Sequence, residues 1–324
     1  MTDTPRRQPV SIRISVTDRC QLRCTYCMPP EGIPKRPQGD ILSFEQMVRF
    51  VRELQAGFDL LKVRITGGEP LIRLGIVDLV AMLAGLNLKD FALTTNGQAL
   101  AGMAGDLKRA GLHRVNVSLD SVRAGTYQRM THGGDLGRTL DGIREALRVG
   151  LTPVKTNTVV VRGINEEDVP ALVRFAMAHG CHARFLELMP IGVAQSGFPA
   201  RFVPTSGIRA RVETVVRLTP IAGDAGGSSL DFLAVDAAGR RGTVGFISSE
   251  SQPFCSGCTR LRLTSTGDLI TCLAREESVR VRDLLLTDTR ETAGALRQLV
   301  ARALEGKCVR ASFDSTRPMA TVGG

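Results

Sequence analysis

One pattern repeats along the first 190 residues, and it constrains the fold more than any other feature of the sequence. From Ser11 to Met189, a short run rich in β-branched residues is followed by a turn rich in Gly or Asn and then by an amphipathic stretch of helical length. Alternating strands and helices with right-handed crossovers form a parallel sheet covered by helices. Six such units are predicted, with strands at residues 12–16, 60–66, 91–95, 113–119, 154–161 and 183–188.

This pattern predicts an α/β fold, with the sheet either open or curled into a partial (β/α)6 barrel of the TIM type. The first helix is predicted over residues 43–56, where Ser43 can act as the N-cap and the apolar residues form one stripe. Binding sites in such folds lie at the carboxyl ends of the strands. Four segments of unusual composition fall there: residues 66–70, 95–97, 118–121 and 187–190.

The pattern changes after Pro190, where a stretch rich in Gly and Pro is followed by short strand-like runs. We therefore expect two parts, a partial barrel over residues 1–190 and an α+β segment over residues 191–324 that closes the open side of the barrel. The predicted strands of the second part are residues 232–235, 242–247, 261–264 and 269–272, and its predicted helices are residues 281–286 and 293–304.

Composition limits the partners of the chain. No apolar stretch approaches the roughly 18 to 20 residues that span a bilayer, and residues 1–10 lack an apolar signal segment, so we expect a cytoplasmic protein without a membrane partner. The net charge of +10 favours anionic partners. Only two Tyr and no Trp can stack on bases, which makes nucleic acid a poor candidate.

Three cysteines, Cys20, Cys24 and Cys27, stand within eight residues directly after the first predicted strand. Four cysteines usually ligate an iron-sulfur cluster, so a trio leaves one iron open to another ligand. A structural zinc site or unrelated free thiols are the alternatives. Zinc needs a fourth ligand, and no His stands near this loop.

A second trio, Cys255, Cys258 and Cys272, lies among the short C-terminal strands. A small zinc ribbon is a more serious alternative here, because paired cysteines with a later cysteine also suit zinc. No His follows His182, however, and only Cys308 remains downstream as a fourth ligand. We therefore expect a second iron-sulfur cluster with an open iron, and we leave Cys181 and Cys308 unassigned.

Cations gather on two of the predicted strands. Lys62, Arg64 and Thr66 share one face at a spacing of two residues, as do Arg260 and Arg262. Buried cations are costly unless an anion neutralises them, and arginine suits phosphate oxygens. Salt bridges at the surface are the alternative, but apolar residues flank Lys62 and Arg64 in the sequence.

The spacing of the first trio, with Tyr26 before its last cysteine, resembles the signature of the radical S-adenosylmethionine (SAM) superfamily, and Thr-Gly-Gly-Glu-Pro at residues 66–70 strengthens the resemblance. It implies that the amine and carboxylate of SAM chelate the open iron and that the Gly-Gly-Glu segment receives the amine. Glycines let backbone approach a ligand closely, and a carboxylate compensates an ammonium group. The SAM contacts implied are Tyr26, Gly68, Glu69, Ser118 and Met189.

With both trios, the chain resembles the GTP 3′,8-cyclase family of molybdenum cofactor (molybdopterin) biosynthesis along nearly its whole length. The matching segments are residues 11–20, 62–70, 94–97, 117–121, 155–157, 184–190 and the final Gly323 and Gly324. The resemblance implies a lyase with two [4Fe–4S] clusters that converts GTP to (8S)-3′,8-cyclo-7,8-dihydroguanosine 5′-triphosphate. A 5′-deoxyadenosyl radical derived from SAM would remove the ribose 3′ hydrogen, and the sugar radical would close onto carbon 8 of the purine bound at the second cluster.

The resemblance also implies the roles of individual residues. The GTP contacts are Arg13, Lys62, Arg64, Thr95, Lys155, Arg184, Arg260 and Arg262, and the catalytic set is Cys20, Cys24, Cys27, Arg13, Arg260 and Arg262. The Gly323–Gly324 tail either enters the site or is a disordered terminus. The partners implied are a reductant such as flavodoxin or ferredoxin, a downstream cyclic pyranopterin monophosphate synthase, and a second copy of the chain in a homodimer.

Two other functions stay open at this point. A radical SAM enzyme that modifies a peptide would predict more C-terminal cysteines than the second trio and Cys308, since its auxiliary cluster is fully ligated. A non-catalytic, metal-stabilised module that binds nucleic acid is suggested by the positive charge alone.

Overall fold

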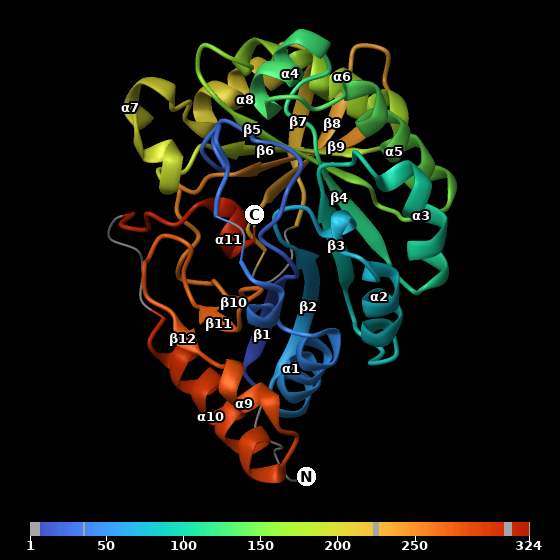
Figure 1. Ribbon diagram of the computed structural model, residues 1–324. Coiled ribbons are helices and arrows are strands. Elements are labelled where there is room, and N and C mark those ends of the chain that lie inside the picture. Colours follow the sequence, from blue (N-terminus) through green and yellow to red (C-terminus); the bar gives the residue numbers. More distant parts are fainter. Residues whose placement is uncertain (1–6, 35, 223–226, 308–312, 324) are drawn as a thin grey trace, which may run out of the picture.

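A single twelve-stranded sheet runs through the molecule (Figure 1). The computed structural model describes residues 7–34, 36–222, 227–307 and 313–323. Strand order is β12-β11-β10-β1-β2-β3-β4-β5-β6-β9-β8-β7. The six strands predicted in the first part are all present and pair in parallel, as β1 (Pro9–Ser15), β2 (Asp59–Thr66), β3 (Phe91–Thr95), β4 (Arg114–Ser118), β5 (Lys155–Val160) and β6 (His182–Glu187).

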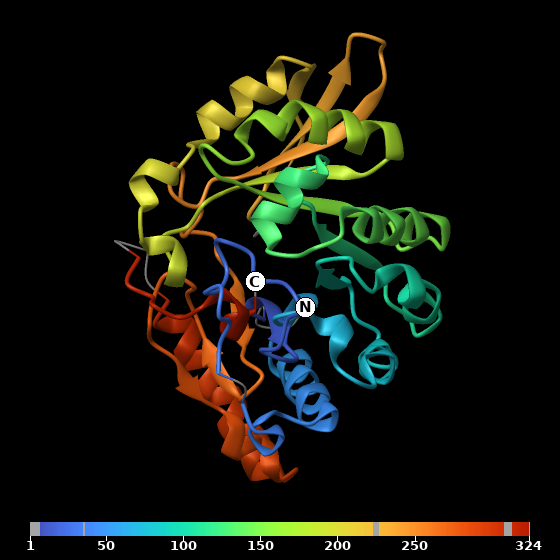
Figure 2. The same cartoon turned by 45° about the horizontal axis from the view of Figure 1, so that its top comes forward.

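Helices cover the outer face of these strands, as Figures 1 and 2 show. The predicted first helix is α1 (Phe44–Gly57), and Ser43 caps it as expected, because its hydroxyl accepts from the Gln46 N–H while the Gln46 side chain accepts from the Ser43 N–H. Buried Phe50, Ile65 and Phe91 lie in the apolar layer between helices and sheet. The other helices of this layer are α2 (Ile76–Ala84), α3 (Leu100–Arg109), α4 (Ala124–Thr131), α5 (Leu136–Arg148) and α6 (Val169–His179).

The C-terminal segment extends the sheet at both edges. Strand β9 (Arg241–Ile247) pairs in parallel with β6, and β10 (Arg260–Leu263) pairs in parallel with β1. The edges of a six-stranded sheet offer unpaired N–H and C=O groups, and these two strands satisfy them. The remaining strands are β7 (Val216–Pro220) and β8 (Leu230–Asp236) beyond β9, and β11 (Asp268–Ile270) and β12 (Val279–Arg280) beyond β10.

The sheet is therefore mixed and open, since β7 and β12 stand at opposite ends of its strand order. The C-terminal strands do not close the barrel as expected, because each edge takes its own strands and the two sets do not meet. Helix α11 (Met319–Val322) instead lies in the opening (Figure 1). The division at residue 190 stays a prediction, because one sheet runs through both parts.

Two late helices were predicted correctly, as α9 (Arg282–Leu286) and α10 (Arg290–Glu305). Helix α10 packs on α1, where Arg297 pairs with Glu53 and Arg49 donates to the Thr292 hydroxyl at 2.6 Å. Among the described residues, no helix has the length and apolar character needed to cross a bilayer. Elements not predicted are β7, β12, α7 (Phe198–Arg201), α8 (Thr205–Glu213), α11 and the short 3-10 turns η1 (Gln38–Asp40), η2 (Pro70–Ile72), η3 (Glu166–Asp168) and η4 (Gly192–Gln195).

Replacing Ser43 tests the cap of α1. Ser43→Ala leaves the N–H of Gln46 without its side-chain acceptor, and we expect it to lower the free energy of unfolding by roughly 1 kcal/mol. Urea unfolding followed by circular dichroism measures the change. Ser43→Asp supplies an equivalent acceptor and should keep most of the stability, so an equal loss in both variants would contradict the capping role.

Candidate active site

The first trio lies on the loop that follows β1, with all three thiols half-buried. Burial, followed by the neighbouring charge of Cys20, raises the pKa of the Cys27 thiol to about 12. Burial and the nearby charges of Asp120 and Cys27 also hold the pKa of Cys24 well above its usual value. Three thiolates at this position therefore need a bound cation, which the irons of a cluster would supply.

The arrangement of the cysteines bears on the zinc alternative. Within the described part of the chain, no three or more of His, Cys, Asp and Glu converge as ligands for one metal ion. Structural zinc needs four ligands around a single ion. A four-iron cluster is larger than a single ion and is held by thiolates that are further apart.

Gly67 and Gly68 bring the turn after β2 against the loop of the first trio. The Gly68 N–H donates to the Thr17 carbonyl at 2.7 Å, and the Glu69 N–H donates to the Arg19 carbonyl at 2.8 Å. A Cβ at Gly68 would lie only 2.3 Å from the Arg19 carbonyl oxygen, and one at Gly67 would lie 2.6 Å from that of Thr17. Only glycine therefore permits this contact between the two loops.

Glu69 is a buried carboxyl group at the carboxyl end of β2. It accepts from the Leu71 N–H at 3.0 Å, from the Thr95 hydroxyl at 2.7 Å and from the Asn96 N–H at 2.7 Å. Burial outweighs these hydrogen bonds and raises the pKa of Glu69 to about 7. The Asn96 side chain also lies 3.7 Å from the Cys20 sulfur, so Asn96 joins the carboxyl group to the first trio.

Thr95, at the end of β3, lies beside the Glu69 carboxyl group. Its hydroxyl donates to Glu69 and accepts from the Gly97 N–H at 3.0 Å, and the residue is 2% exposed. Thr95 is thus brought to the carboxyl group at the first trio and is absent from the residues that line the two described cavities near the cations.

Tyr26 contacts Asp120, a residue to which the sequence motifs gave no role. Its hydroxyl donates to Asp120 at 2.8 Å, and the other Asp120 oxygen accepts from the Val159 N–H at 2.9 Å. Burial raises the pKa of Asp120 to about 6. Asp120 follows the end of β4 in the 118–121 segment, so its position after a strand was the signal that could have found it. Ser118 ends β4 and is half-buried.

Cations lie side by side in the sheet because of its register. Arg13 of β1 stands between Arg262 of β10 and Arg64 of β2, while Ser11 stands between Arg260 and Lys62. Residues in register point to the same side of a sheet. Val63 and Ile65, which alternate with these cations on β2, are buried in the apolar core, so the predicted two-sided character of this strand is confirmed.

A small cavity of about 80 Å³ lies over these cations. Arg114, Lys155 and Arg184 contribute from β4, β5 and β6. Arg114 is paired in two-point contact with Asp90, and Asp231 also reaches the wall. The complete lining is Ser11, Ile12, Arg13, Lys62, Arg64, Arg114, Lys155, Arg184, Gly227, Ser228, Ser229, Asp231 and Arg260.

Several cations of this group are buried together and repel one another. Burial, followed by the charges of Arg184 and other cations, lowers the pKa of Arg64 to about 9. Burial and then Arg184 also lower the pKa of Lys155 to about 8, and burial with Arg262 and Arg64 holds the pKa of Arg13 well below its usual value. The Nε atoms of Arg64 and Arg184 are buried without a hydrogen-bond partner. An anion with several oxygens would satisfy both needs.

The second trio lines a larger cavity of about 640 Å³. This cavity shares Arg13, Ser228 and Arg260 with the smaller one, so the two are adjacent. Burial opposes ionisation of the Cys258 thiol, but the charges of Arg260 and Lys307 outweigh it and lower its pKa to about 7. The other functional side chains on this wall include Cys255, Cys272, Arg262, Met189 and Met319.

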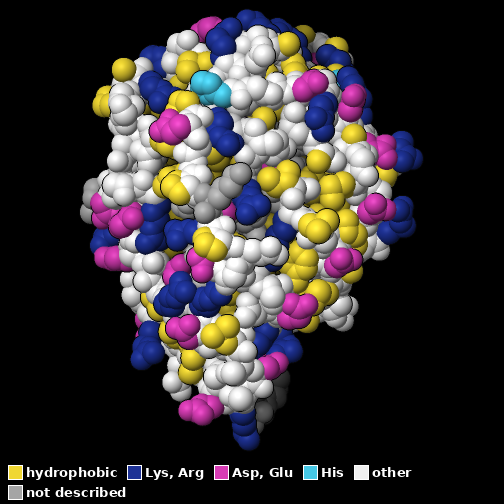
Figure 3. Space-filling view, viewed as in Figure 1, with side chains coloured by type: hydrophobic (Ala, Val, Ile, Leu, Met, Phe, Trp, Pro, Cys, Tyr) yellow, Lys and Arg dark blue, Asp and Glu magenta, His cyan; other side chains and the backbone are white. Residues whose placement is uncertain are grey.

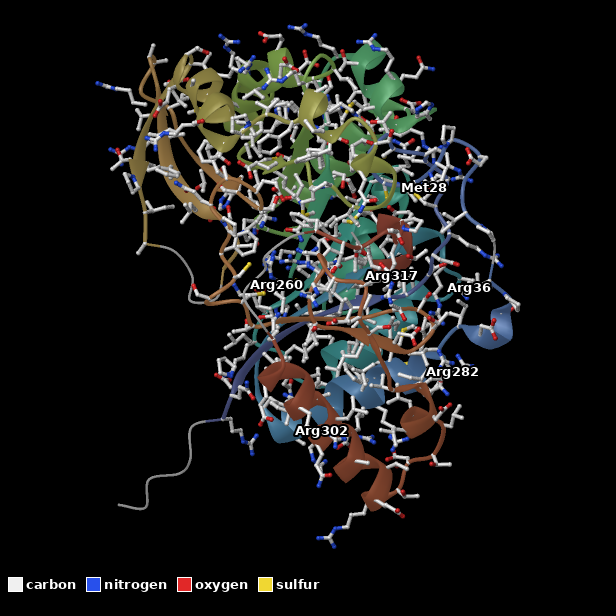
Figure 4. The ribbon with its side chains drawn as sticks, turned by 90° about the vertical axis from the view of Figure 1, so that its left-hand side faces the viewer. Met28, Arg36, Arg260, Arg282, Arg302 and Arg317 are labelled. Atoms are coloured by element: carbon white, nitrogen blue, oxygen red, sulfur yellow. The ribbon has the colours of Figure 1, made fainter. Side chains whose placement is uncertain are left out.

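Residues 313–323, which we call the C-terminal strap, connect the two trios. The Asp314 N–H donates to Ala274, two residues after Cys272, at 2.9 Å, and the Met319 N–H donates to Cys27 at 3.0 Å. In the view of Figure 4, Arg317 of the strap lies between Arg260, which is near the second trio, and Met28, which is next to the first trio.

The tail enters the site as far as it is described. Gly323 is buried, its carbonyl accepts from Arg262, and a Cβ there would lie 2.7 Å from the Thr66 side chain. Of the two alternatives for the tail, entry into the site therefore applies to Gly323. Gly324 and Cys308 lie outside the described residues.

Comparison with known proteins decides the family. Residues 14–176 match the radical SAM superfamily, and residues 181–313 match the family described as Molybdenum Cofactor Synthesis C. The chain is 42% identical to the GTP 3′,8-cyclase of Pelotomaculum thermopropionicum and 41% identical to that of Moorella thermoacetica, in both cases over 100% of each chain. The chain belongs to the GTP 3′,8-cyclase family. Members of this family are radical SAM enzymes, which use a [4Fe–4S] cluster and SAM as cofactors.

A solved structure supports the fold of this family member. The crystal structure of Streptococcus suis SuiB bound to S-adenosylmethionine has a TM-score of 0.62 at 16% identity, over 97% of this chain and 77% of SuiB. At that identity the likeness concerns the fold alone. It confirms a radical SAM α/β fold for the GTP 3′,8-cyclase family member.

Gly68→Ala tests the contact between the first two loops. The added methyl group would meet backbone atoms of Asp18 and Arg19 at less than 3 Å, so we expect the trio loop to be displaced and iron and sulfide retention to fall severalfold. Iron and sulfide analysis after anaerobic reconstitution measures this. Gly102→Ala is the matched control, because a Cβ there meets nothing within 4 Å; equal retention in both variants would contradict the role of Gly68.

Proposed function

We propose that this chain is a GTP 3′,8-cyclase that converts GTP to (8S)-3′,8-cyclo-7,8-dihydroguanosine 5′-triphosphate in molybdenum cofactor biosynthesis. The observation that carries the proposal is that two cavities lie next to each other, one lined by cations and the other by the second trio, and share Arg13 and Arg260. Relatives at 42% and 41% identity over their full length bear this name. A triphosphate suits the first cavity, and a purine suits the second.

The first trio and its surroundings would hold SAM. Cys20, Cys24 and Cys27 ligate the first cluster, which together with SAM supplies a 5′-deoxyadenosyl radical when both are bound. Because Gly68 has no side chain, the methionyl group of SAM can lie close to the backbone there, and the Glu69 carboxylate accepts hydrogen bonds from the ammonium group. Further contacts come from Tyr26, which Asp120 orients, and from Ser118 and Met189.

The cations would hold the triphosphate and fix the ribose. Buried arginines orient phosphate oxygens through paired N–H groups, and correct orientation supplies much of the rate enhancement in a radical reaction. The proposed contacts are Arg13, Lys62, Arg64, Lys155, Arg184, Arg260 and Arg262. Thr95 would act on this substrate only through Glu69, given its hydrogen bond to that carboxyl group.

The second trio, Cys255, Cys258 and Cys272, would hold the second cluster at the wall of the larger cavity, where the purine binds. A cavity of this size encloses most of a nucleotide. Gly323 and Arg262 restrict the space beside Thr66, and they would help to exclude water and oxygen from the reacting atoms.

The proposal has further parts that rest on the family resemblance. They are a homodimer, a reductant such as flavodoxin or ferredoxin, transfer of the product to a cyclic pyranopterin monophosphate synthase, a cytoplasmic location, and the division into a partial barrel over 1–190 and a C-terminal segment over 191–324.

The rival functions find less support. A structure of SuiB bound to its precursor peptide SuiA has a TM-score of 0.57 but only 16% identity, so it speaks for the fold and not for a peptide substrate. A nucleic-acid module needs cations on its surface. The largest group of cations lies instead inside the sheet, and basic and acidic side chains are interspersed on the face shown in Figure 3.

Anaerobic turnover tests the function directly. Reconstituted protein is incubated with dithionite, SAM and one nucleotide at a time, and 5′-deoxyadenosine is measured. We expect GTP to support more of it than ATP, together with a cyclised product from GTP. Equal yields from the two nucleotides would count against the substrate.

Arg64→Gln tests the anion site by binding rather than by turnover. Loss of a buried charge and its fork of donors should weaken GTP binding roughly ten- to a hundredfold, since hydrogen bonds to charged groups contribute about 1.5 to 3 kcal/mol. Equilibrium dialysis with labelled GTP measures this. Arg144→Gln, at an exposed ion pair on α5, is the control; a loss of the same size there would remove the assignment.

The pH dependence of SAM binding tests Glu69. With a pKa of about 7, the free carboxyl group is protonated in acid, whereas a bound ammonium group favours the carboxylate. Binding below that pKa must therefore release a proton. We expect SAM affinity to fall about tenfold per pH unit between roughly pH 7 and pH 5.

Equilibrium dialysis against labelled SAM across that range gives the slope. Glu69→Gln has no carboxyl group to ionise and should lose the dependence, whereas Asp106→Asn, at an exposed ion pair on α3, should keep it. A wild-type slope that survives in Glu69→Gln would assign the proton to another group.

A further inference from the structure

Lys307 contacts both segments that carry the second trio. It follows the end of α10, and its Nζ donates to the Cys258 sulfur at 3.2 Å, to the Arg260 carbonyl at 2.6 Å and to the Thr271 carbonyl at 2.8 Å. Arg260 begins β10, and Thr271 directly precedes Cys272. One ammonium group therefore holds together the two segments that carry the second trio.

The chemistry of lysine suits this position closely. An ammonium group has three N–H donors, and the structure supplies three acceptors in three directions. Arginine has a planar head and cannot reproduce that arrangement. The backbone of Lys307 is also fixed, since its N–H donates to the Leu304 carbonyl at 3.2 Å at the end of α10.

The position of α10 explains how Lys307 reaches the site. This helix packs on α1 through Arg297 with Glu53 and through Arg49 with Thr292, and Leu304 near its end lines the larger cavity. From that end the side chain reaches the wall of the 640 Å³ cavity. Neither the family resemblance nor the spacing of the cysteines gave a role to this part of the sequence.

A cation in contact with a thiolate ligand has a defined electrostatic effect. It stabilises the more negative state of the bound group, and hydrogen bonds to sulfur raise the reduction potential of iron-sulfur clusters. Groups that orient metal ligands also strengthen metal binding, typically ten- to a hundredfold.

We infer that Lys307 is a positioning residue for the second cluster, where it joins the Cys258 and Cys272 segments and raises the reduction potential of the group bound there. The inference rests on the second cluster of the proposed function. It concerns Lys307 alone, and it holds whether or not GTP is the substrate.

Redox titration of the full chain, reconstituted with iron and sulfide and followed by electron paramagnetic resonance, tests the inference. Lys307→Met removes the charge and all three hydrogen bonds at similar side-chain length. We expect at least a tenfold change in the reduction equilibrium of the second cluster, which lowers its midpoint potential by about 59 mV for one electron, while the first cluster is unchanged. The affinity of the variant for iron, measured by competition with a chelator, should fall ten- to a hundredfold.

Two variants complete the experiment. Lys307→Arg keeps the charge and should restore most of the potential but less of the chelator resistance. Arg302→Met, at an exposed arginine on the same helix (Figure 4), should match the wild type in both measurements.

Equal midpoints for Lys307→Met and Arg302→Met, with equal iron retention, would overturn the inference. If Lys307→Met binds too little iron for titration while Arg302→Met binds it fully, the positioning role is supported. Wild-type protein with iron for a single cluster would remove the inference together with the second cluster. Two clusters without turnover of GTP would instead contradict the proposed function alone.

Discussion

Buried positive charge on one face of the sheet is the constraint on which the rest of the structure depends. The parallel register sets Arg13 between Arg262 and Arg64, and β5 and β6 add Lys155 and Arg184. Burial and mutual repulsion lower the pKa of several of these groups, so the site is strained electrostatically without an anion. A fold that tolerates this arrangement must take stability from its apolar layer and reserve the interior of the sheet for a ligand.

Buried acidic groups lie at the carboxyl ends of the same strands, near the first trio. Glu69 and Asp120 are buried carboxyl groups with pKa values raised to about 7 and 6, and the nearby thiols resist ionisation as well. This end favours positively charged partners, whereas the other end favours an anion. In the proposed function, the cluster and the SAM ammonium group occupy the first end and the triphosphate the second, so each ligand is directed to its own place by charge.

The sequence was sufficient for local features and insufficient for distant pairing. Six strands and the Ser43 cap depend on neighbouring residues and were predicted. The pairing of β9 with β6 and of β10 with β1 joins segments far apart in the chain, and no periodicity reports such a choice. The place of Thr95 beside Glu69 and the contact of Lys307 with Cys258 were missed for the same reason.

The C-terminal strap shows why the site needs the whole chain. Its backbone meets Ala274 near the second trio, then Cys27 in the first, and ends with Gly323 against Arg262 and Thr66. Each of these contacts joins the last residues to a strand end or loop formed much earlier in the sequence. Phe313 and Met319 of the strap line the 640 Å³ cavity, so the wall of this cavity is complete only when the strap is in place. The strap therefore completes the surroundings of both trios, although the two trios come from opposite ends of the chain.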